Sequence, residues 1–267
     1  MKNRYKAKKN ETLCIIQARF GSTRLKGKVL KQIVGKPMLA LQIERVLRSK
    51  KLDNLVVATG EARENIGVVE LCSILKVPCF RGSNEDVLDR FYQCAVQRKP
   101  AHIVRLTGDC PLIGPDIVDQ VVAAHISEKY DYTSNLHPPT WPDGMDVEVI
   151  TMECLSDVHK KANLPSEREH VTPFIYKNRD MFSIGNIEQK IDQSKFRLTV
   201  DEKEDFLVIK EIFESLYPQN PFFKLDDILG LFVKKPKLLD HNIRFSRNEG
   251  LRQSEMEDQR ITNNAKQ

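Results

Sequence analysis

The chain has 267 residues, of which 40% are hydrophobic and 30% are charged, with a net charge of +5. These values are typical of a globular protein with one large domain and exclude a disordered or fibrous chain. No apolar run approaches the roughly 20 residues that span a bilayer, so no membrane partner and a cytoplasmic location are expected. The positive charge is local, because residues 1–30 carry +8 and the other 237 residues carry −3, which argues against a nucleic-acid partner.

The first half of the chain alternates strand-like apolar runs with helix-like segments. The expected strands are 13–18, 54–59, 77–80 and 102–107, and the expected helices are 37–48, 62–75, 85–98 and 115–127. Ser83 or Asn84 can serve as the N-cap of the third helix. This order predicts an α/β fold with a mainly parallel sheet, helices on both faces, and strands that end at one edge.

The pattern changes after about residue 130. The expected strands are 131–134, 145–150, 181–186 and 195–200, and the expected helices are 152–162, 166–178, 201–217 and 225–233, with a Pro-rich loop at 135–144. Asp201 is the expected N-cap of helix 201–217. Beyond Asn242 the chain is polar with little periodicity. We therefore expect a basic tail at 1–11, one domain at 12–240 and a polar tail or interface arm at 241–267.

The loop after the first strand, residues 18–28, reads A-R-F-G-S-T-R-L-K-G-K. Small residues let backbone N–H groups approach a ligand, and the cations balance its negative charge. Five residues separate Gly21 from Gly27, and Val29 follows Lys28. The loop is therefore not a P-loop, which needs four intervening residues and a hydroxyl after the lysine. The pattern predicts a polyphosphate site but not an ATPase or GTPase.

A second segment, residues 104–112, reads V-R-L-T-G-D-C-P-L and places Asp109 just after a predicted buried strand. Ligands in open α/β sheets bind at this edge. Mg²⁺ is usually held by one or two carboxylates together with phosphate oxygens, so Asp109 opposite the basic loop is a candidate ligand. Asp109 could equally be a turn residue that binds its own backbone. The residues by themselves leave both interpretations open.

These two segments resemble the sugar nucleotidyltransferases of the cytidylyltransferase family, which includes enzymes that activate sialic acid and 3-deoxy-manno-octulosonate as CMP-sugars. Segments 80–90, 167–173 and 248–250 also resemble the SpsF-like branch for spore coat polysaccharide. The resemblance extends from about Leu13 to the tail. It implies a three-layer Rossmann-like fold of the GT-A, or nucleotide-diphospho-sugar transferase, type. A small dimerisation extension and the sugar-site elements would lie at about 131–190.

The resemblance also implies roles for individual residues. The nucleotide and its triphosphate would be held by Ala18, Arg19, Gly21, Ser22, Arg24, Lys28 and Asp109, with Arg81 near the cytosine or ribose. Arg24 and Lys28 would stabilise the departing pyrophosphate and, with Asp109, form the catalytic set. Asp109 and Asp201 would bind Mg²⁺, with Asp205 as the alternative to Asp201. Lys26 stands where relatives have proline, and an added cation is compatible with phosphate binding.

The sugar end of the site is less defined. The candidates come from the Pro-rich loop, the strand after it and a helix start: Asn135, His137, Trp141, Asp143, Asp146, Glu148, Arg168 and His170. Trp141 could stack on a sugar or anchor the core. His170 could contact a sugar carboxylate, act as a base or simply end a helix.

The function implied is transfer of CMP from CTP to an acidic sugar, nonulosonic or related, with release of pyrophosphate, for surface polysaccharide or glycan synthesis. Mg²⁺ would be the cofactor, and the protein would be a homodimer. The first alternative is an NDP-sugar glycosyltransferase of the same fold. Such enzymes usually carry Asp-x-Asp, and the nearest match here is Asp146-Val147-Glu148. The second alternative is a non-catalytic nucleotide-binding module.

Overall fold

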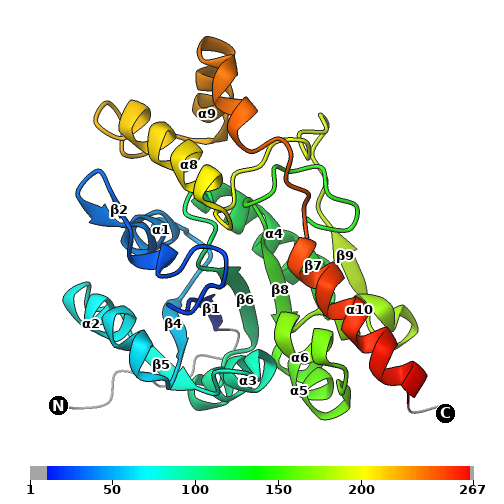
Figure 1. The fold of residues 1–267 in the computed structure, drawn as a ribbon. Helices are drawn as coiled ribbons and strands as arrows, with labels where there is room; N and C mark the ends of the chain where they lie inside the picture. Colours follow the sequence, from blue (N-terminus) through cyan, green and yellow to red (C-terminus); the bar gives the residue numbers. More distant parts are fainter. Residues whose placement is uncertain (1–10, 265–267) are drawn as a thin grey trace.

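The computed structural model describes residues 11–264, which form three layers with one sheet between two layers of helices (Figure 1). In this part of the chain the main sheet has seven strands in the order β5-β4-β1-β6-β8-β7-β9. They are β1 Thr12–Gln17, β4 Asn54–Gly60, β5 Cys79–Gly82, β6 His102–Thr107, β7 Tyr132–Ser134, β8 Glu148–Thr151 and β9 Ile184–Asn186. β8 pairs antiparallel with both neighbours, and the other pairs are parallel. The predicted α/β fold with a mainly parallel sheet is confirmed.

Each face of the sheet carries its own hydrophobic core, because successive strand side chains point to opposite faces. In β1, Cys14 and Ile16 pack with α1, α2, α4, α8 and α9, whereas Leu13 and Ile15 pack with α3, α5 and α7. The helices are α1 Met38–Val46, α2 Ile66–Ile74, α3 Val87–Arg98, α4 Pro115–Glu128, α5 Met152–Lys161, α7 Pro173–Lys177, α8 Lys203–Leu216 and α9 Leu225–Lys234. No helix within residues 11–264 combines the length and the apolar character that crossing a bilayer requires.

The loops after β1 and β6 meet at one edge of the sheet, since these two strands are parallel neighbours. Gly108 makes the close approach possible. A Cβ at this position would lie 2.9 Å from the Cβ of Ala18 and 3.1 Å from the carbonyl oxygen of Gln17. The missing side chain thus brings Asp109 beside the basic loop.

Helix 166–178 of the sequence prediction is two helices, α6 Pro165–His170 and α7. Val171 between them has φ +73°, outside the helical range. Pro173 then begins α7 at its first position, because proline has no backbone N–H with which to continue α6. The N-cap of α3 also differs from the prediction. Asp86, rather than Ser83 or Asn84, accepts a hydrogen bond from the backbone N–H of Asp89.

Segment 195–200, predicted to be a strand, lies outside the sheet. Its backbone instead pairs with a single residue of the Pro-rich loop. Asp143 donates from its N–H to the Phe196 carbonyl at 2.9 Å and accepts from the Leu198 N–H at 2.6 Å. Two residues after Leu198, the Val200 N–H donates to the Asp109 carbonyl at 2.8 Å. The segment is extended because its backbone bonds to two loops. The apolar pattern alone does not distinguish such a segment from a strand of the sheet.

The predicted polar tail at 241–267 is wrong for its central part, which forms α10 Glu249–Asn264 (Figure 1). α10 packs on α6. Its buried residues include Ser254 and Asp258, and the Asp258 carboxylate accepts a hydrogen bond from the Ser166 N–H at 3.1 Å. Polar groups make the contact between α10 and α6, so the sequence of α10 does not repeat apolar residues at helical spacing. The basic tail predicted at 1–11 falls almost wholly outside the described residues.

Candidate active site

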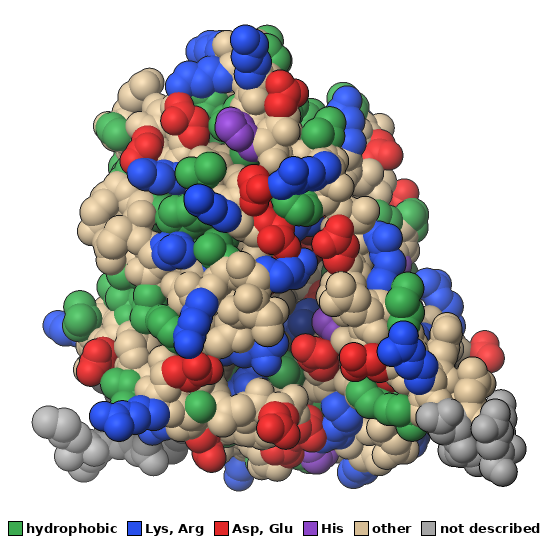
Figure 2. Space-filling model, viewed as in Figure 1, with side chains coloured by type: hydrophobic (Ala, Val, Ile, Leu, Met, Phe, Trp, Pro, Cys, Tyr) green, Lys and Arg blue, Asp and Glu red, His purple; other side chains and the backbone are tan. Residues whose placement is uncertain are grey.

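A cavity of about 620 Å³ opens at the edge of the sheet where β1 and β6 end. It is lined by the loop after β1, the loop after β6, the Pro-rich loop with β8, α6 and α7, residues 199–201 and the start of α10. Figure 2 shows acidic and basic side chains gathered around the hollow in the middle of this face. The volume is that of a small-molecule site.

Lys28 forms the polar centre of the cavity. Its Nζ atom lies 3.2 Å from Asp109 Oδ2 and 2.9 Å from Asp201 Oδ1, and it donates to the Val200 carbonyl at 2.7 Å. Two carboxylates from distant loops therefore converge on one cation. A donor set of two carboxylates that face a phosphate-binding loop fits a divalent cation, whose remaining ligands are usually phosphate oxygens and water.

The charges of this centre shift one another's pKa values. Burial would lower the pKa of the Lys28 ammonium, but the charges of Asp109 and Asp201 raise it above its usual value. Burial would likewise raise the pKa of the Asp109 carboxyl, yet Lys28 and neighbouring hydrogen bonds lower it to about 2. Lys28 and Asp109 are therefore both charged at neutral pH.

Arg24 also faces the acidic side of the site. Its guanidinium lies 3.2 Å from Asp201, 3.3 Å from Glu202 and 3.5 Å from Glu249. Its side chain is about one-third exposed, so it can exchange these partners for phosphate oxygens. Glu202, not Asp201, is the N-cap residue of α8, which leaves the Asp201 carboxylate directed at Arg24 and Lys28.

The other predicted residues of the opening loop lie around this centre. Ala18, Arg19 and Ser22 line the cavity, and the Ala18 N–H is held by the Ala58 carbonyl at 3.0 Å. The Arg19 guanidinium lies 3.6 Å from Glu169. Gly21 is not part of the lining.

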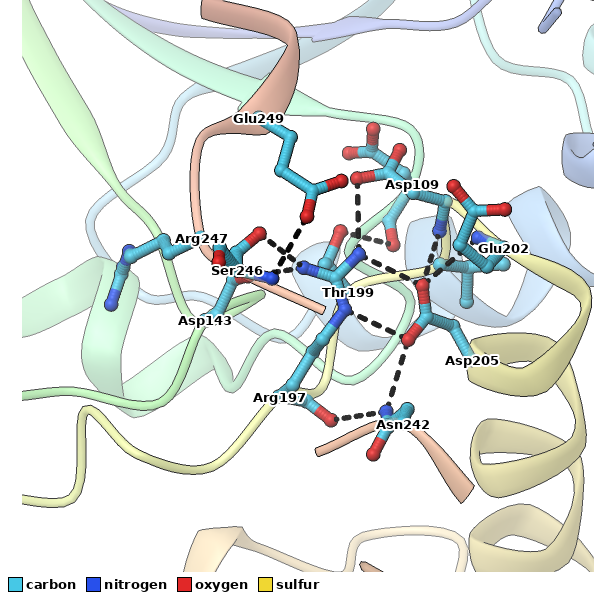
Figure 3. A network of polar contacts seen from close by, with 12 residues as sticks. Asp109, Asp143, Arg197, Thr199, Glu202, Asp205, Asn242, Ser246, Arg247 and Glu249 are labelled. Atoms are coloured by element: carbon cyan, nitrogen blue, oxygen red, sulfur yellow. Dashed lines mark hydrogen bonds and ion pairs between the residues drawn. The ribbon is translucent and has the colours of Figure 1, made fainter. Parts of the chain in front are cut away.

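Arg197, which the sequence did not single out, connects the two ends of the site (Figure 3). It donates to both carboxylate oxygens of Asp205 at 2.8 and 2.9 Å, and to Asp143 at 3.0 Å. It also reaches the Ser246 carbonyl at 3.2 Å and lies 3.5 Å from Asp201. The fallback metal ligand, Asp205, is thus fully engaged by Arg197 and lies outside the cavity lining, whereas Asp201 is part of it.

Two carboxylates of the predicted sugar set each face an arginine. Asp146 accepts from Arg247, and Glu148 accepts from Arg105. The second oxygen of Glu148 accepts from the Tyr132 hydroxyl at 2.6 Å. Burial and neighbouring carboxylates raise the pKa of Asp146 to about 7, despite the opposing charge of Arg247.

The two predicted histidines lie on the cavity wall. His137 packs against Tyr176 with ring centroids 4.4 Å apart. The Nε2 atom of His170 lies 3.2 Å from the Ser254 hydroxyl on α10. Burial lowers the pKa of both imidazoles, so both are neutral at pH 7. These groups can contact a polar ring without adding charge.

Two predicted cationic residues lie outside the described lining of the cavity. Arg81 is exposed and donates to the Glu61 carbonyl. Arg168 donates to Asp86 at 3.0 Å through Nε and fixes α6 to the start of α3. The site that contains Lys28 does not include either guanidinium.

Asn135 and Trp141 are likewise absent from the described lining and have structural partners. Asn135 donates to the Met145 carbonyl at 2.7 Å and accepts from the Val147 N–H at 2.9 Å, which shapes the Pro-rich loop. Trp141 is 9% exposed and donates to the Ile187 carbonyl at 3.1 Å. Trp141 was expected either to stack on a sugar or to anchor the core, and its burial and its contact with Ile187 agree with the core anchor.

Several lining residues were missed by sequence reasoning, among them Arg105, Tyr176, Thr199, Glu249 and Ser254. Arg105 had a signal, because the two-residue period of a strand places it on the same face as Thr107, next to the Asp109 loop. Glu249 lay in segment 248–250, which resembles the SpsF-like branch, but Ser254 had no signal, since polar contacts hold α10 in place.

A basic loop and Asp109 at the ends of the parallel strands β1 and β6, joined by Asp201 from outside the sheet, form a site that suits a nucleotidyltransferase. Residues 13–256 match the family model described as Cytidylyltransferase, and the chain belongs to this family. It is 40% identical over 234 residues to "Uncharacterized protein MJ1063" of Methanocaldococcus jannaschii, covering 86% of this chain and 94% of that protein. It is 35% identical over 235 residues to the spore coat polysaccharide biosynthesis protein SpsF of Bacillus subtilis, covering 85% and 96%.

Solved structures show the same fold. A cytidylyltransferase from Leptospira borgpetersenii aligns with a TM-score of 0.84 at 31% identity, covering 89% of this chain and all of that one. A CMP:2-keto-3-deoxy-manno-octonic acid synthetase complexed with CTP aligns with a TM-score of 0.62 at 17% identity, covering 77% and 99%. The expected family membership and enzyme class are therefore confirmed.

Proposed function

We propose that this cytidylyltransferase transfers CMP from CTP to an acidic sugar, nonulosonic or related, and releases pyrophosphate. The observation that carries the proposal is the single centre formed by Lys28, Arg24, Asp109 and Asp201. Cations that neutralise a triphosphate and carboxylates that fit a divalent metal are both needed for attack at an α-phosphate. The product would serve surface polysaccharide or glycan synthesis, as the name of the SpsF relative suggests.

In the proposed reaction a sugar hydroxyl oxygen attacks the α-phosphorus of CTP in line with the leaving group. The bond between the α-phosphorus and the bridging oxygen breaks, pyrophosphate departs with the bond electrons, and the hydroxyl proton passes to solvent or a cavity carboxylate. Arg24 and Lys28 would leave their carboxylate partners to hold the β- and γ-phosphates. Ala18, Arg19 and Ser22 would orient the nucleotide beside them.

Mg²⁺ is the proposed cofactor, with Asp109 and Asp201 as its protein ligands. When bound, it would neutralise phosphate charge and acidify the attacking hydroxyl. The fit rests on the two carboxylates that already converge on one cationic group.

The test is a panel of the four ribonucleoside triphosphates against several 2-keto sugar acids with Mg²⁺, read by pyrophosphate release. We expect release with CTP and at least one acid, and loss of release on chelation of the metal. Hydrolysis of an NDP-sugar without pyrophosphate formation would favour the glycosyltransferase alternative. CTP binding without turnover in any mixture would favour the non-catalytic module.

A homodimer with contacts from about residues 131–190 is also proposed, since the family resemblance implies it. Light scattering should give twice the chain mass of 30.7 kDa. A mass of one chain across the micromolar range would contradict this part of the proposal.

A further inference from the structure

Three carboxylates between the Pro-rich loop and β8 each face one arginine. Asp143 pairs with Arg197, Asp146 with Arg247 and Glu148 with Arg105. The three carboxylates all line the cavity, but Arg105 is the only one of their arginines within the described lining. Arg105 is therefore the guanidinium of this group that a bound sugar could touch.

The donors of Arg197 and Arg105 are used very differently. Arg197 engages two carboxylates and a carbonyl through Nε and Nη1, and its Nη2 reaches a carboxylate as well. Arg105 is anchored to Glu148 through Nη1, while its Nε is buried without a hydrogen-bond partner. A guanidinium carries five N–H donors, so Arg105, which lines the cavity and pairs with a single carboxylate, keeps donors for a ligand that Arg197 has already used.

Glu148 anchors Arg105 without competing for its free edge. One carboxylate oxygen of Glu148 holds Arg105 Nη1, and the other accepts from the Tyr132 hydroxyl at 2.6 Å. The Arg105 side chain is 11% exposed, so it has little freedom to turn away. The free edge of a planar guanidinium matches the two oxygens of a carboxylate.

The surroundings of Arg105 favour an acid group over a phosphate of CTP. Of the cationic side chains in the described lining, Arg19, Arg24 and Lys28 all come from the opening loop, and Arg105 alone comes from the sheet. The neighbouring wall includes the neutral His137–Tyr176 pair beside the carboxylates that the arginines hold. Arg105 is thus the cation that remains for the acceptor when the loop cations hold the triphosphate.

We infer that Arg105 is a specificity-determining residue that binds the carboxylate of the acceptor sugar, with Glu148 and Tyr132 holding it in position. This inference rests on the proposed function. It assigns the choice of an acidic acceptor to a strand residue rather than to the predicted sugar-binding histidines.

The experiment compares 3-deoxy-manno-octulosonate and N-acetylneuraminate with their methyl esters as acceptors. Arg105→Gln combined with Glu148→Gln keeps a neutral hydrogen-bonded pair and avoids a lone buried charge. We expect the wild type to prefer the acid, and the double variant to raise KM for the acid roughly 10- to 100-fold. KM for the ester and the Kd for CTP, measured by calorimetry, should change less than about threefold. Arg105→Lys keeps the charge but loses the planar fork. Its KM for the acid should lie between those of the wild type and the double variant.

Arg244→Gln combined with Glu204→Gln is the matched control, because it makes the same change in an arginine–carboxylate pair that lies outside the described cavity lining. It should retain the preference for the acid. A folded double variant that binds CTP and still prefers the acid would overturn the role of Arg105 but not cytidylyl transfer. If the wild type uses the acid and its ester equally well, the role of Arg105 is also overturned and cytidylyl transfer is not. Absence of pyrophosphate with every acceptor would overturn the proposed function, and the inference with it.

Discussion

The two ends of the cavity are built in opposite ways. The end proposed to hold the triphosphate, called the triphosphate end below, takes Arg24 and Lys28 from one continuous loop and meets them with Asp109 and Asp201. The end proposed to hold the acceptor, called the acceptor end below, collects side chains from β6, β8, α6, α7 and α10, so its residues are far apart in the sequence. A local motif can specify the first end, whereas only the folded chain creates the second.

This difference separates reaction class from substrate choice. In the proposed function the loop and its carboxylates interact with the charge that all nucleoside triphosphates share, so this end would set the reaction and not the acceptor. The acceptor end holds buried acid–arginine pairs and neutral rings, which select by geometry. The following variants should therefore divide into those that stop the reaction and those that change its acceptor or its stability.

The largest effect is expected from Asp109→Asn, which removes a carboxylate from the triphosphate end. Pyrophosphate release should fall by at least about 10³-fold, because both a proposed metal ligand and a partner of Lys28 are lost. The circular dichroism spectrum should stay unchanged. Asp116→Asn, an exposed carboxylate at the start of α4, serves as the control and should keep full activity. Near-normal pyrophosphate release by Asp109→Asn would contradict the idea that changes at the triphosphate end stop the reaction.

Arg197→Met tests the residue that joins the two ends. Asp205 is fully buried and Asp143 nearly so, and both would lose their cation. Breaking a buried ion pair by removing one partner costs about 3–5 kcal/mol, so urea unfolding should show a loss of that size. The exposed Arg244, which pairs with Glu204, gives the matched control: Arg244→Met should cost less than about 1 kcal/mol. Equal losses of unfolding free energy in Arg197→Met and Arg244→Met would contradict the role of Arg197 in joining the two ends.

The same contrast explains what the sequence could predict. Strands β1, β4 and β6 were found because short segments rich in apolar residues are local signals. Asp109 was found because it follows such a strand. Segment 195–200 was mistaken for a strand because an extended chain with alternating apolar residues looks the same whether it pairs with a strand or with a loop.

The acceptor end was only partly predictable. His137, Asp146 and Glu148 were chosen for their residue types, and they do line the cavity. Arg168 was chosen in the same way but is held by Asp86 outside it. Residue type does not reveal which cations already have partners, because those partners come from distant elements. α10 was missed entirely, since its packing depends on polar contacts.

Ending the chain after Asn248 removes α10 and should affect mainly the acceptor end. Ser254, which contacts His170, and the Asp258 carboxylate that binds α6 would both be lost. KM for the acceptor should rise about tenfold. The Kd for CTP should change little, because the partly exposed Arg24–Glu249 pair is worth less than about 1 kcal/mol. A larger change in CTP affinity than in acceptor KM would reverse the assignment of α10.

The smallest expected effect is a pH-dependent gain in stability from Asp146→Asn. Burial raises the pKa of Asp146 to about 7 in the folded protein, from the ordinary value of 3.8. Between these values the folded chain binds more protons than the unfolded chain, so this residue lowers stability progressively as pH rises from about 4 to 7.

Asparagine cannot ionise, so Asp146→Asn should have almost no effect near pH 4 and should stabilise by roughly 1–3 kcal/mol at pH 8. Thermal melts at half-unit pH steps would show a Tm difference that grows to several degrees and then levels off above pH 7. The exposed Asp157 provides the control, and Asp157→Asn should leave the pH profile of the wild type unchanged. If Asp146→Asn instead destabilises at pH 8, the Asp146–Arg247 pair is a net stabiliser. Arg247 would then stabilise the ionised Asp146 carboxylate in the folded protein, as Lys28 stabilises the ionised Asp109 carboxylate at the triphosphate end.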